Sequence, residues 1–416
     1  MIFRTQTTLF QNVLDCMKVA LVKSDQANET GQYVLIKTET GQLHLAVKHQ
    51  DVVMKVSIDK APADLLEIGQ DGEFAVDGTE LSYMFKHFDL ADKFHVDFVP
   101  SEKAEPKKDS GEEAVDAQEI RQLGVLNFNM PTRTKKKNCE VWPFPVAEVM
   151  IRPKIDSKGN NRLTLSVATL AKHIGQVELA VGKDSGNASF RNVMIRKGDA
   201  KYEVVAASPN MLAWIESDKF VSASGGDFKL VALWEQASRV SKMLVPEQDV
   251  DIFTDGEAIV FCQDLLYGSG KEKIGKVEIK ISCARDPFAK FEKTIEKLDL
   301  KWECKLKREH LRGVCHRLER KLNLPRTICA FSPADEEMSF SKKGAVTNAS
   351  VGIADVKGDA LEIILSSQYL KACVDAAESD DIMVKFSGVR SLGSMKLSDE
   401  LTAYFNPYGP PEADDK

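Results

Sequence analysis

The sequence predicts an α+β fold of three repeated domains, each with two helices packed on antiparallel sheets. A short alternating strand runs into an amphipathic helix at residues 1–22, 162–180 and 301–322. In each segment the apolar period changes from two to about 3.6, which is typical of a strand that leads into a helix. Three such segments in one chain indicate an internal repeat.

Strands and a second helix follow each of these segments. Alternating residues at 32–58 and 189–208 predict strands, and Asp255-Gly256 predicts a hairpin turn. We expect the second helices near residues 79–88, 229–244 and 366–378. The repeated unit is therefore helix, strands, helix, strands.

Breaks in composition place the domains at residues 1–150, 151–297 and 298–408. Residues 101–121 are dense in charge and poor in large apolar side chains, so we interpret them as a flexible insertion in the first domain. Residues 409–416 carry two prolines and three acids and are expected to form a flexible acidic tail. A length of 416 residues agrees with three domains, since one domain takes roughly 100–200 residues.

The composition describes a soluble protein, with 43% hydrophobic and 29% charged residues. No apolar run approaches the roughly 20 residues of a membrane-spanning helix. The N-terminal segment lacks the apolar core and cleavage site of a secretory signal. These features predict a cytoplasmic protein without a membrane partner.

Catalytic and metal-binding motifs are missing from the sequence. It contains no GxGxxG, P-loop, HExxH or GxSxG pattern, so we expect neither an enzyme nor a cofactor. The eight cysteines are scattered without a CxxC pair, and His87 and His95 have no ligand at metal-binding spacing. We expect no metal site, and most cysteines to be buried thiols.

The order and spacing of several segments resemble the beta sliding clamp of bacterial DNA polymerase III. The resemblance rests on residues 163–215, 281–295 and 362–410 and covers nearly the whole chain. Two segments depart from it: the family's Thr-Asp-Gly-His-Arg-Leu-Ala is here residues 207–213, and its C-terminal Met-Pro-Met-Arg-Leu is here Asn406-Pro407-Tyr408 and a tail. The chain is thus identified as a divergent relative.

The resemblance implies a homodimeric ring. The helices of such a ring contact duplex DNA regardless of its base sequence. The segment at 307–322 fits this role, because it has an apolar stripe of Leu311, Val314, Cys315, Leu318 and Leu322. A separate basic stripe consists of Arg308, Arg312, His316 and Arg320. A solvated helix face would give the same pattern. The DNA contacts we expect are Lys18, Lys23, Lys86, Lys172, Arg239, Lys242, Arg308, Arg312 and Arg320.

The net charge of −7 then requires acidic residues to gather elsewhere, on the outer sheets, the insertion and the tail. Contacts of Lys and Arg with phosphates carry no sequence information, which suits a protein that slides along DNA.

The resemblance also implies a pocket between the second and third domains for short peptide motifs of the replicative polymerase and the clamp loader. Its expected lining is Pro209, Met211, Leu212, Tyr369, Tyr404, Asn406, Pro407 and Tyr408. Met211, Leu212 and Tyr404 could equally belong to the ordinary core. The altered segments leave an alternative function open: a clamp-fold paralogue that acts as an interaction or regulatory scaffold and does not encircle DNA.

Overall fold

The structure is a computed structural model that forms two compact units. Unit 1 comprises Met1–Ala168, Val221–Gly225 and Arg239–Ser282, and unit 2 comprises Thr169–Phe220, Gly226–Ser238 and Cys283–Lys416. The residues described are 1–17, 20–21, 33–49, 52–59, 61–62, 64–87, 92–100, 124–131, 139–146, 161–254, 258–267, 272–285, 287–319, 326–341, 349–389 and 391–408.

The described residues of unit 1 form two antiparallel sheets. The smaller consists of β1 (Ile2–Gln6), β5 (Leu66–Gln70), β7 (Lys93–Pro100), β8 (Gly124–Pro131) and β9 (Cys139–Val146), in the order β5-β1-β7-β8-β9. The larger consists of β2 (Tyr33–Glu39), β3 (Gln42–His49), β4 (Val52–Ile58), β6 (Gly72–Asp77), β10 (Arg162–Ser166), β14 (Ser222–Ser224), β16 (Asp249–Thr254), β17 (Ala258–Tyr267) and β18 (Glu272–Ser282). Its order is β14-β10-β16-β17-β18-β4-β3-β2-β6.

Unit 2 is built on one antiparallel sheet of twelve strands. These are β11 (Asn192–Lys197), β12 (Tyr202–Ala207), β13 (Met211–Ser217), β15 (Phe228–Leu233), β19 (Trp302–Lys307), β20 (Arg326–Ser332), β21 (Glu337–Ser341), β22 (Ala349–Lys357), β23 (Leu361–Ser366), β24 (Asp381–Phe386), β25 (Gly393–Lys396) and β26 (Leu401–Phe405). Their order is β15-β11-β12-β13-β26-β25-β24-β19-β22-β21-β20-β23.

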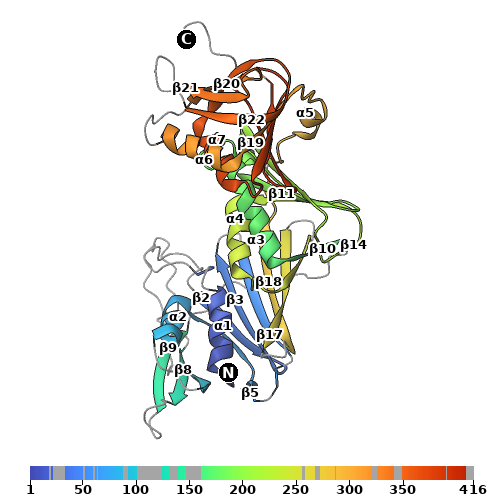
Figure 1. The fold of residues 1–416 in the computed structure, drawn as a ribbon. Helices are drawn as coiled ribbons and strands as arrows, with labels where there is room; N and C mark the ends of the chain where they lie inside the picture. The colour runs from blue at the N-terminus through green and yellow to red at the C-terminus, as the bar shows by residue number, and fades with distance from the viewer. Residues whose placement is uncertain are drawn as a thin grey trace, which may run out of the picture. The chain divides into compact units, whose positions relative to one another are not determined.

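In the part of the chain that the structure describes, six α-helices of ten or eleven residues alternate with these strands along the sequence (Figure 1). They are α1 (Thr7–Met17), α2 (Gly78–His87), α3 (Val167–Gln176), α4 (Trp234–Met243), α6 (Arg308–Arg317) and α7 (Ser367–Ala376). A shorter helix, α5 (Glu292–Glu296), follows β18, and two 3₁₀ turns, η3 (Val177–Ala180) and η4 (Ala188–Arg191), follow α3. None of the helices in the described part of the chain is long and apolar enough to cross a membrane.

The strand order confirms the threefold repeat. Helices α1, α3 and α6 follow β1, β10 and β19, and helices α2, α4 and α7 follow β6, β15 and β23. The ladders β2-β3-β4, β11-β12-β13 and β20-β21-β22 correspond, as do β7-β8-β9, β16-β17-β18 and β24-β25-β26. Among the described residues of the third repeat, β5 and β14 have no counterpart, and the end of β22 pairs with β19 instead. The domain boundaries after residues 150 and 297 stay predictions.

One predicted helix was wrong over its first turn. The segment predicted at 229–244 begins with strand β15, and helix α4 starts only at Trp234. Along β15, Phe228, Leu230 and Ala232 are buried while Lys229 is exposed, and the strand pairs with β11. The apolar spacing of this short segment suits either structure, and only the neighbouring strand decides between them.

The core of the smaller sheet in unit 1 is aromatic. Phe10 of α1 packs against Phe85 of α2 and Phe94 of β7, with ring centroids 5.2 and 5.3 Å apart. Phe3 and Phe128 complete the cluster, and all five side chains are at most 3% exposed. Each helix therefore buries one apolar face on its sheet, as the sequence pattern predicted.

Several sequence predictions fall outside the described residues. They concern the insertion at 101–121, the tail at 409–416 and the Asp255-Gly256 turn, although β16 and β17 on either side of that turn do pair. Cys304, Cys315, Cys329 and Cys373 are buried, and Cys16, Cys262 and Cys283 are half-buried. No group of His, Cys, Asp or Glu side chains in the described ranges could hold a metal ion.

Strands β18 and β4 join two repeats within unit 1, and a glycine permits their close approach. Gly275 of β18 lies opposite Ile58 of β4. A Cβ atom at position 275 would lie 1.9 Å from the backbone oxygen of Ser57. A side chain here would force the two strands apart.

We therefore expect Gly275→Ala to lower the free energy of unfolding by about 1–3 kcal/mol, the usual cost of overpacking. Gly313→Ala is the matched control, because a Cβ atom at that position of α6 meets open space. Alanine there should stabilise the helix by about 0.5–1 kcal/mol. Urea unfolding of both variants measures the effects, and equal stability of Gly275→Ala and the native chain would contradict the close approach of the two strands.

A candidate DNA-binding helix face and a candidate peptide pocket

Helix α6 has the most basic exposed face among the helices that the structure describes. Leu311, Val314 and Cys315 are buried, as the sequence predicted, and Leu318 directly after the helix is buried too. The exposed side chains of the helix are Glu309, His310, Arg312, His316 and Arg317. Sequence reasoning had not selected Arg317, although its place in the last turn, away from the apolar stripe, could have shown it.

Two arginines of α6 also contact α7, which lies beside it (Figure 1). The Nε–H of the half-buried Arg308 donates to the backbone oxygen of Val374 at 3.4 Å. A guanidinium at this place stabilises the C-terminal end of α7. Arg312 forms an ion pair with Asp375 at 3.6 Å, and both side chains are about half exposed. Exposed pairs of this kind are weak, so a phosphate could compete for Arg312.

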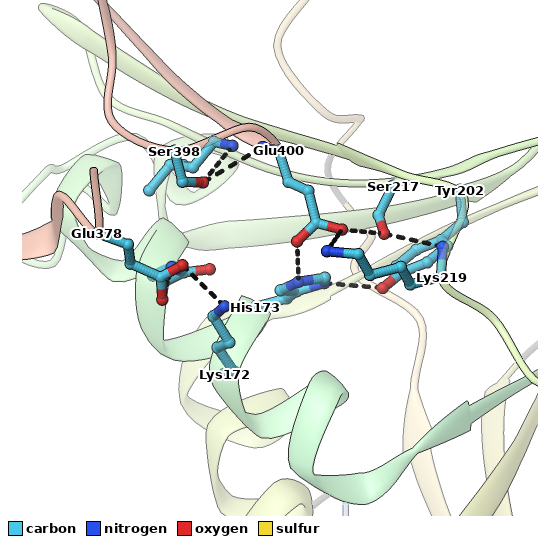
Figure 2. A network of polar contacts seen from close by, with 10 residues as sticks. Lys172, His173, Tyr202, Ser217, Lys219, Glu378, Ser398 and Glu400 are labelled. Atoms are coloured by element: carbon cyan, nitrogen blue, oxygen red, sulfur yellow. Dashed lines mark hydrogen bonds and ion pairs between the residues drawn. The ribbon is translucent and has the colours of Figure 1, made fainter. Parts of the chain in front are cut away.

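The other predicted DNA contacts differ in their exposure and in whether they already bind an acidic side chain. Lys86 on α2 and Lys242 in the last turn of α4 are exposed, and Arg239 on α4 is half-buried. Lys172 on α3 is exposed but donates to Glu378 at 2.9 Å (Figure 2). Helix α1 has neither Lys nor Arg within Thr7–Met17. Lys18, Lys23 and Arg320 lie outside the described residues.

The predicted pocket residues on strands β13 and β26 lie on two different faces of the sheet in unit 2. Strand β13 pairs with β26, so Met211 lies opposite Phe405 and Leu212 lies opposite Tyr404. Successive side chains of a strand point to opposite faces, which separates Met211 from Leu212. The same alternation separates Phe405 from Tyr404.

A narrow crevice lies on the first face. Met211, Tyr369 and Asn406, all predicted from the sequence, line it together with Leu365, Ser366, Leu370, Cys373, Met395 and Phe405. Its volume is about 10 Å³, which is at the lower limit for a single water molecule. A peptide side chain could enter only after these residues move apart. Burial raises the pKa of the Cys373 thiol to about 12, so the thiol is neutral.

An aromatic cluster lies on the second face. Leu212 and Tyr404 pack with Trp214, Phe288 and Phe291, and the ring centroids of Trp214 and Phe291 are 5.5 Å apart. Phe288 and Phe291 come from the segment that connects the second repeat to the third. The interpretation of Leu212 and Tyr404 as core residues therefore agrees with the structure, and burial raises the pKa of the Tyr404 hydroxyl.

Three predicted pocket residues lie apart from both groups. Pro209 is exposed in the turn between β12 and β13. Pro407 is buried, and the exposed Tyr408 receives the Arg326 guanidinium over its ring at 4.1 Å. The backbone N–H of Tyr408 donates to the oxygen of Ile364, which attaches the C-terminal residues to β23.

Solved structures of similar fold are bacterial sliding clamps. The chain matches the DNA polymerase sliding clamp of Bacillus subtilis with a TM-score of 0.75 and 13% identity, over 98% of both chains. It matches the beta subunit of Streptococcus pyogenes DNA polymerase with a TM-score of 0.75 and 14% identity, over 98% of this chain and 100% of that one. With the Helicobacter pylori beta clamp bound to a DNA ligase peptide, the TM-score is 0.70 and the identity is 10%, over 98% of this chain and 99% of that one.

No protein-family model and no curated protein matches the chain. The structural likeness nevertheless spans the whole chain, so the chain has the fold of the bacterial beta sliding clamp. The fold predicted from the sequence is confirmed.

The aromatic cluster gives a testable consequence. Phe291→Ala removes a buried ring, and we expect it to lower the free energy of unfolding by about 3–5 kcal/mol and to change the fluorescence of Trp214. Pro209→Ala, at an exposed turn, should change the stability by less than about 0.5 kcal/mol. Urea unfolding followed by tryptophan fluorescence compares the two variants. Similar small effects of both would show that Phe291 is not part of a packed cluster.

Proposed function

We propose that the chain is a sliding clamp, a ring that encircles duplex DNA and tethers a replicative DNA polymerase, without catalytic chemistry of its own. The observation that carries this proposal is the repeat itself, together with the way in which its strands pair. Such a function would place the protein in the cytoplasm.

The pairing between repeats favours a closed ring of two chains. Strand β4 pairs with β18, and its counterpart β13 pairs with β26, the counterpart of β18. The counterpart of β4 and β13 in the third repeat is β22, and the counterpart of β18 and β26 in the first repeat is β9. Among the described residues, β9 has β8 as its only strand partner, and Ala349–Gly352 of β22 pairs with β21 on one side and with no strand on the other. Pairing of β22 with β9 of a second copy would close six repeats into a homodimer.

The exposed basic side chains of the helices support binding to the phosphate backbone. Arg312 and Arg317 on α6, Lys86 on α2 and Lys242 on α4 can contact phosphates without reading the base sequence. Lys172, Arg239 and Arg308 remain candidates, as do the undescribed Lys18, Lys23 and Arg320. A ring holds DNA by topology, so weak contacts suffice and permit sliding.

Short peptides of the polymerase and the clamp loader are the proposed partners. The crevice around Met211, Tyr369 and Asn406 is the candidate pocket, with Pro209 and Tyr408 exposed nearby in the chain. Apolar and aromatic side chains of this kind suit peptide anchors. The effective concentration of a tethered polymerase at its template would be raised by the ring.

A non-encircling scaffold is the second candidate function. The observation that favours it is the internal pairing of predicted DNA contacts, since Lys172 binds Glu378 and Arg312 binds Asp375. Pairs of this kind lower the positive charge that DNA would meet. Oligomeric state and DNA affinity distinguish the two functions.

The ring predicts a stable dimer. Light scattering over a range of concentrations should give about twice the chain mass of 46.2 kDa, unchanged on dilution. A monomer at all concentrations would contradict ring closure and favour the scaffold.

The basic face of α6 predicts a specific decrease in DNA affinity. Arg312→Glu combined with Arg317→Glu should weaken binding to duplex DNA regardless of its sequence. The slope of log K against log salt should also decrease by about one for each phosphate that the variant no longer binds. Fluorescence anisotropy with a labelled duplex measures both quantities.

The matched control is Lys229→Glu combined with Lys301→Glu, which makes the same charge change at exposed positions outside the helices. The control variant should keep most of the affinity and the salt slope of the native chain. If the two double variants weaken binding equally, the α6 face is not the DNA-binding surface.

A further inference from the structure

A buried polar cluster connects α3 of the second repeat to the hairpin between β25 and β26 of the third, within unit 2 (Figure 2). His173 on α3 is only 1% exposed. Its Nδ1 atom lies 2.9 Å from the Tyr202 hydroxyl, and its Nε2 atom lies 3.6 Å from Oε2 of Glu400. Because a carboxylate only accepts, the ring proton belongs on Nε2, and Nδ1 accepts from the Tyr202 O–H.

Glu400 is in turn held by β13 and by its own hairpin. The Ser217 hydroxyl donates to Oε1 of Glu400 at 2.5 Å, and Nζ of Lys219 lies 3.2 Å from the same oxygen. The backbone N–H of Glu216 donates to the Glu400 backbone oxygen at 3.1 Å. Ser398 accepts from the backbone N–H of Glu400 at 3.3 Å. The carboxylate of Glu400, a residue of the third repeat, is therefore held by side chains of the second repeat, while Ser398 holds the Glu400 backbone within the hairpin.

Other charged groups surround His173. Lys172 on the same helix binds Glu378, which follows α7, and Gln176 also donates to Glu378 at 3.0 Å. On the strand side, Lys197 of β11 is opposite Tyr202 and donates to the Gly226 oxygen. The charges that act on the imidazole are therefore mixed in sign: Glu400 and Glu378 favour its protonation, and Lys172 opposes it.

This environment disfavours a proton on Nδ1. Burial lowers the pKa of His173 below its usual 6.5, and the Glu400 carboxylate offsets this only in part. Burial acts to raise the pKa of Glu400, but hydrogen bonds from Ser217 and Lys219 hold that pKa below its usual value. Burial raises the pKa of Tyr202 to about 12, so its hydroxyl keeps its proton. A second proton on His173 would also require the Tyr202 O–H to turn away.

We propose that His173 and Glu400 form a pH-sensitive latch that holds α3 of the second repeat on the terminal hairpin of the third and weakens on acidification. The latch lies at the Ser217 end of the β13–β26 ladder, and the crevice around Met211 lies at the other end. It does not depend on DNA binding or on ring closure.

The direction of the pH effect follows from the lowered pKa values of His173 and Glu400. The folded chain binds a proton on His173 more weakly than the unfolded chain does, so this contribution to stability is complete above about pH 6.5 and decreases as the pH falls from there. The contribution of Glu400 is present above its unfolded pKa and is lost as the pH falls through its lower folded pKa. Protonation of either residue weakens the latch in acid, and the contribution of His173 is lost at a higher pH than that of Glu400.

Hydrogen exchange of the full chain between pH 7.5 and 5.5, corrected for the intrinsic rates, tests the latch. Protection of the β13 and β26 amides in the native chain should fall by up to about tenfold between pH 6.5 and 5.5, since one proton changes an equilibrium by at most tenfold per pH unit. In His173→Gln, protection should be lower at pH 7.5 and independent of pH. An unchanged pH dependence in this variant would overturn the proposal.

His44→Gln is the matched control. His44 in unit 1 is half-buried and lies 2.9 Å from the Ser57 hydroxyl, and its pKa, like that of His173, is lowered mainly by burial, with a further contribution from Lys55. This variant should leave the pH dependence of the β13 and β26 amides as in the native chain. If His173→Gln fails to fold, the NMR titration of the His173 ring in the native chain decides: a midpoint below pH 6.5 supports the latch, and a midpoint at or above 6.5 overturns it.

Discussion

The backbone groups of an edge strand need partners, and this constraint organises the whole chain. Each repeat has strands at both borders of its sheets, and the chain satisfies them by pairing one repeat with the next, through β18 with β4 and through β13 with β26. The close approach at Gly275 shows how tightly such a junction is built. A repeat on its own would leave these strands without their partners.

The helices depend on the sheets in the same way. A helix of ten or eleven residues is marginal in water, and α1, α3 and α6 gain their stability from an apolar face packed on strands. The opposite face contributes little to folding, so its residues can change freely. A fold that requires apolar faces of the right size, and not particular residues on them, is compatible with a TM-score of 0.75 at 13% identity to the Bacillus subtilis clamp. The charges of Arg312 and Arg317 on the exposed face of α6 are therefore not required by its packing on the sheet.

The sequence could predict what depends on local periodicity. The repeat, the apolar stripe of α6 and most of the second helices follow from apolar spacing in one segment at a time. The start of α4 could not be predicted, because β15 is distinguished from a helix only by its pairing with β11. The pocket residues show the same limit: alternation along β13 could have separated Met211 from Leu212, but the position of Phe288 and Phe291 depends on long-range packing that no local pattern records.

Three kinds of interaction join the second and third repeats in unit 2, and they differ in what can disturb them. The β13–β26 ladder uses backbone hydrogen bonds, and the cluster of Leu212, Trp214 and Phe291 uses apolar packing; neither contains a group that titrates near neutral pH. The polar network around His173 contains an imidazole, whose pKa burial lowers below its usual 6.5, and it holds the hairpin end of the same ladder. Because the apolar cluster and the Met211 end of the ladder do not contain the imidazole, we expect a change of its protonation to loosen the Ser217 end of the junction without separating the repeats. The Met211 end, where the crevice lies, is held independently by the hydrogen bond from the Asn406 N–H to the Asn210 oxygen.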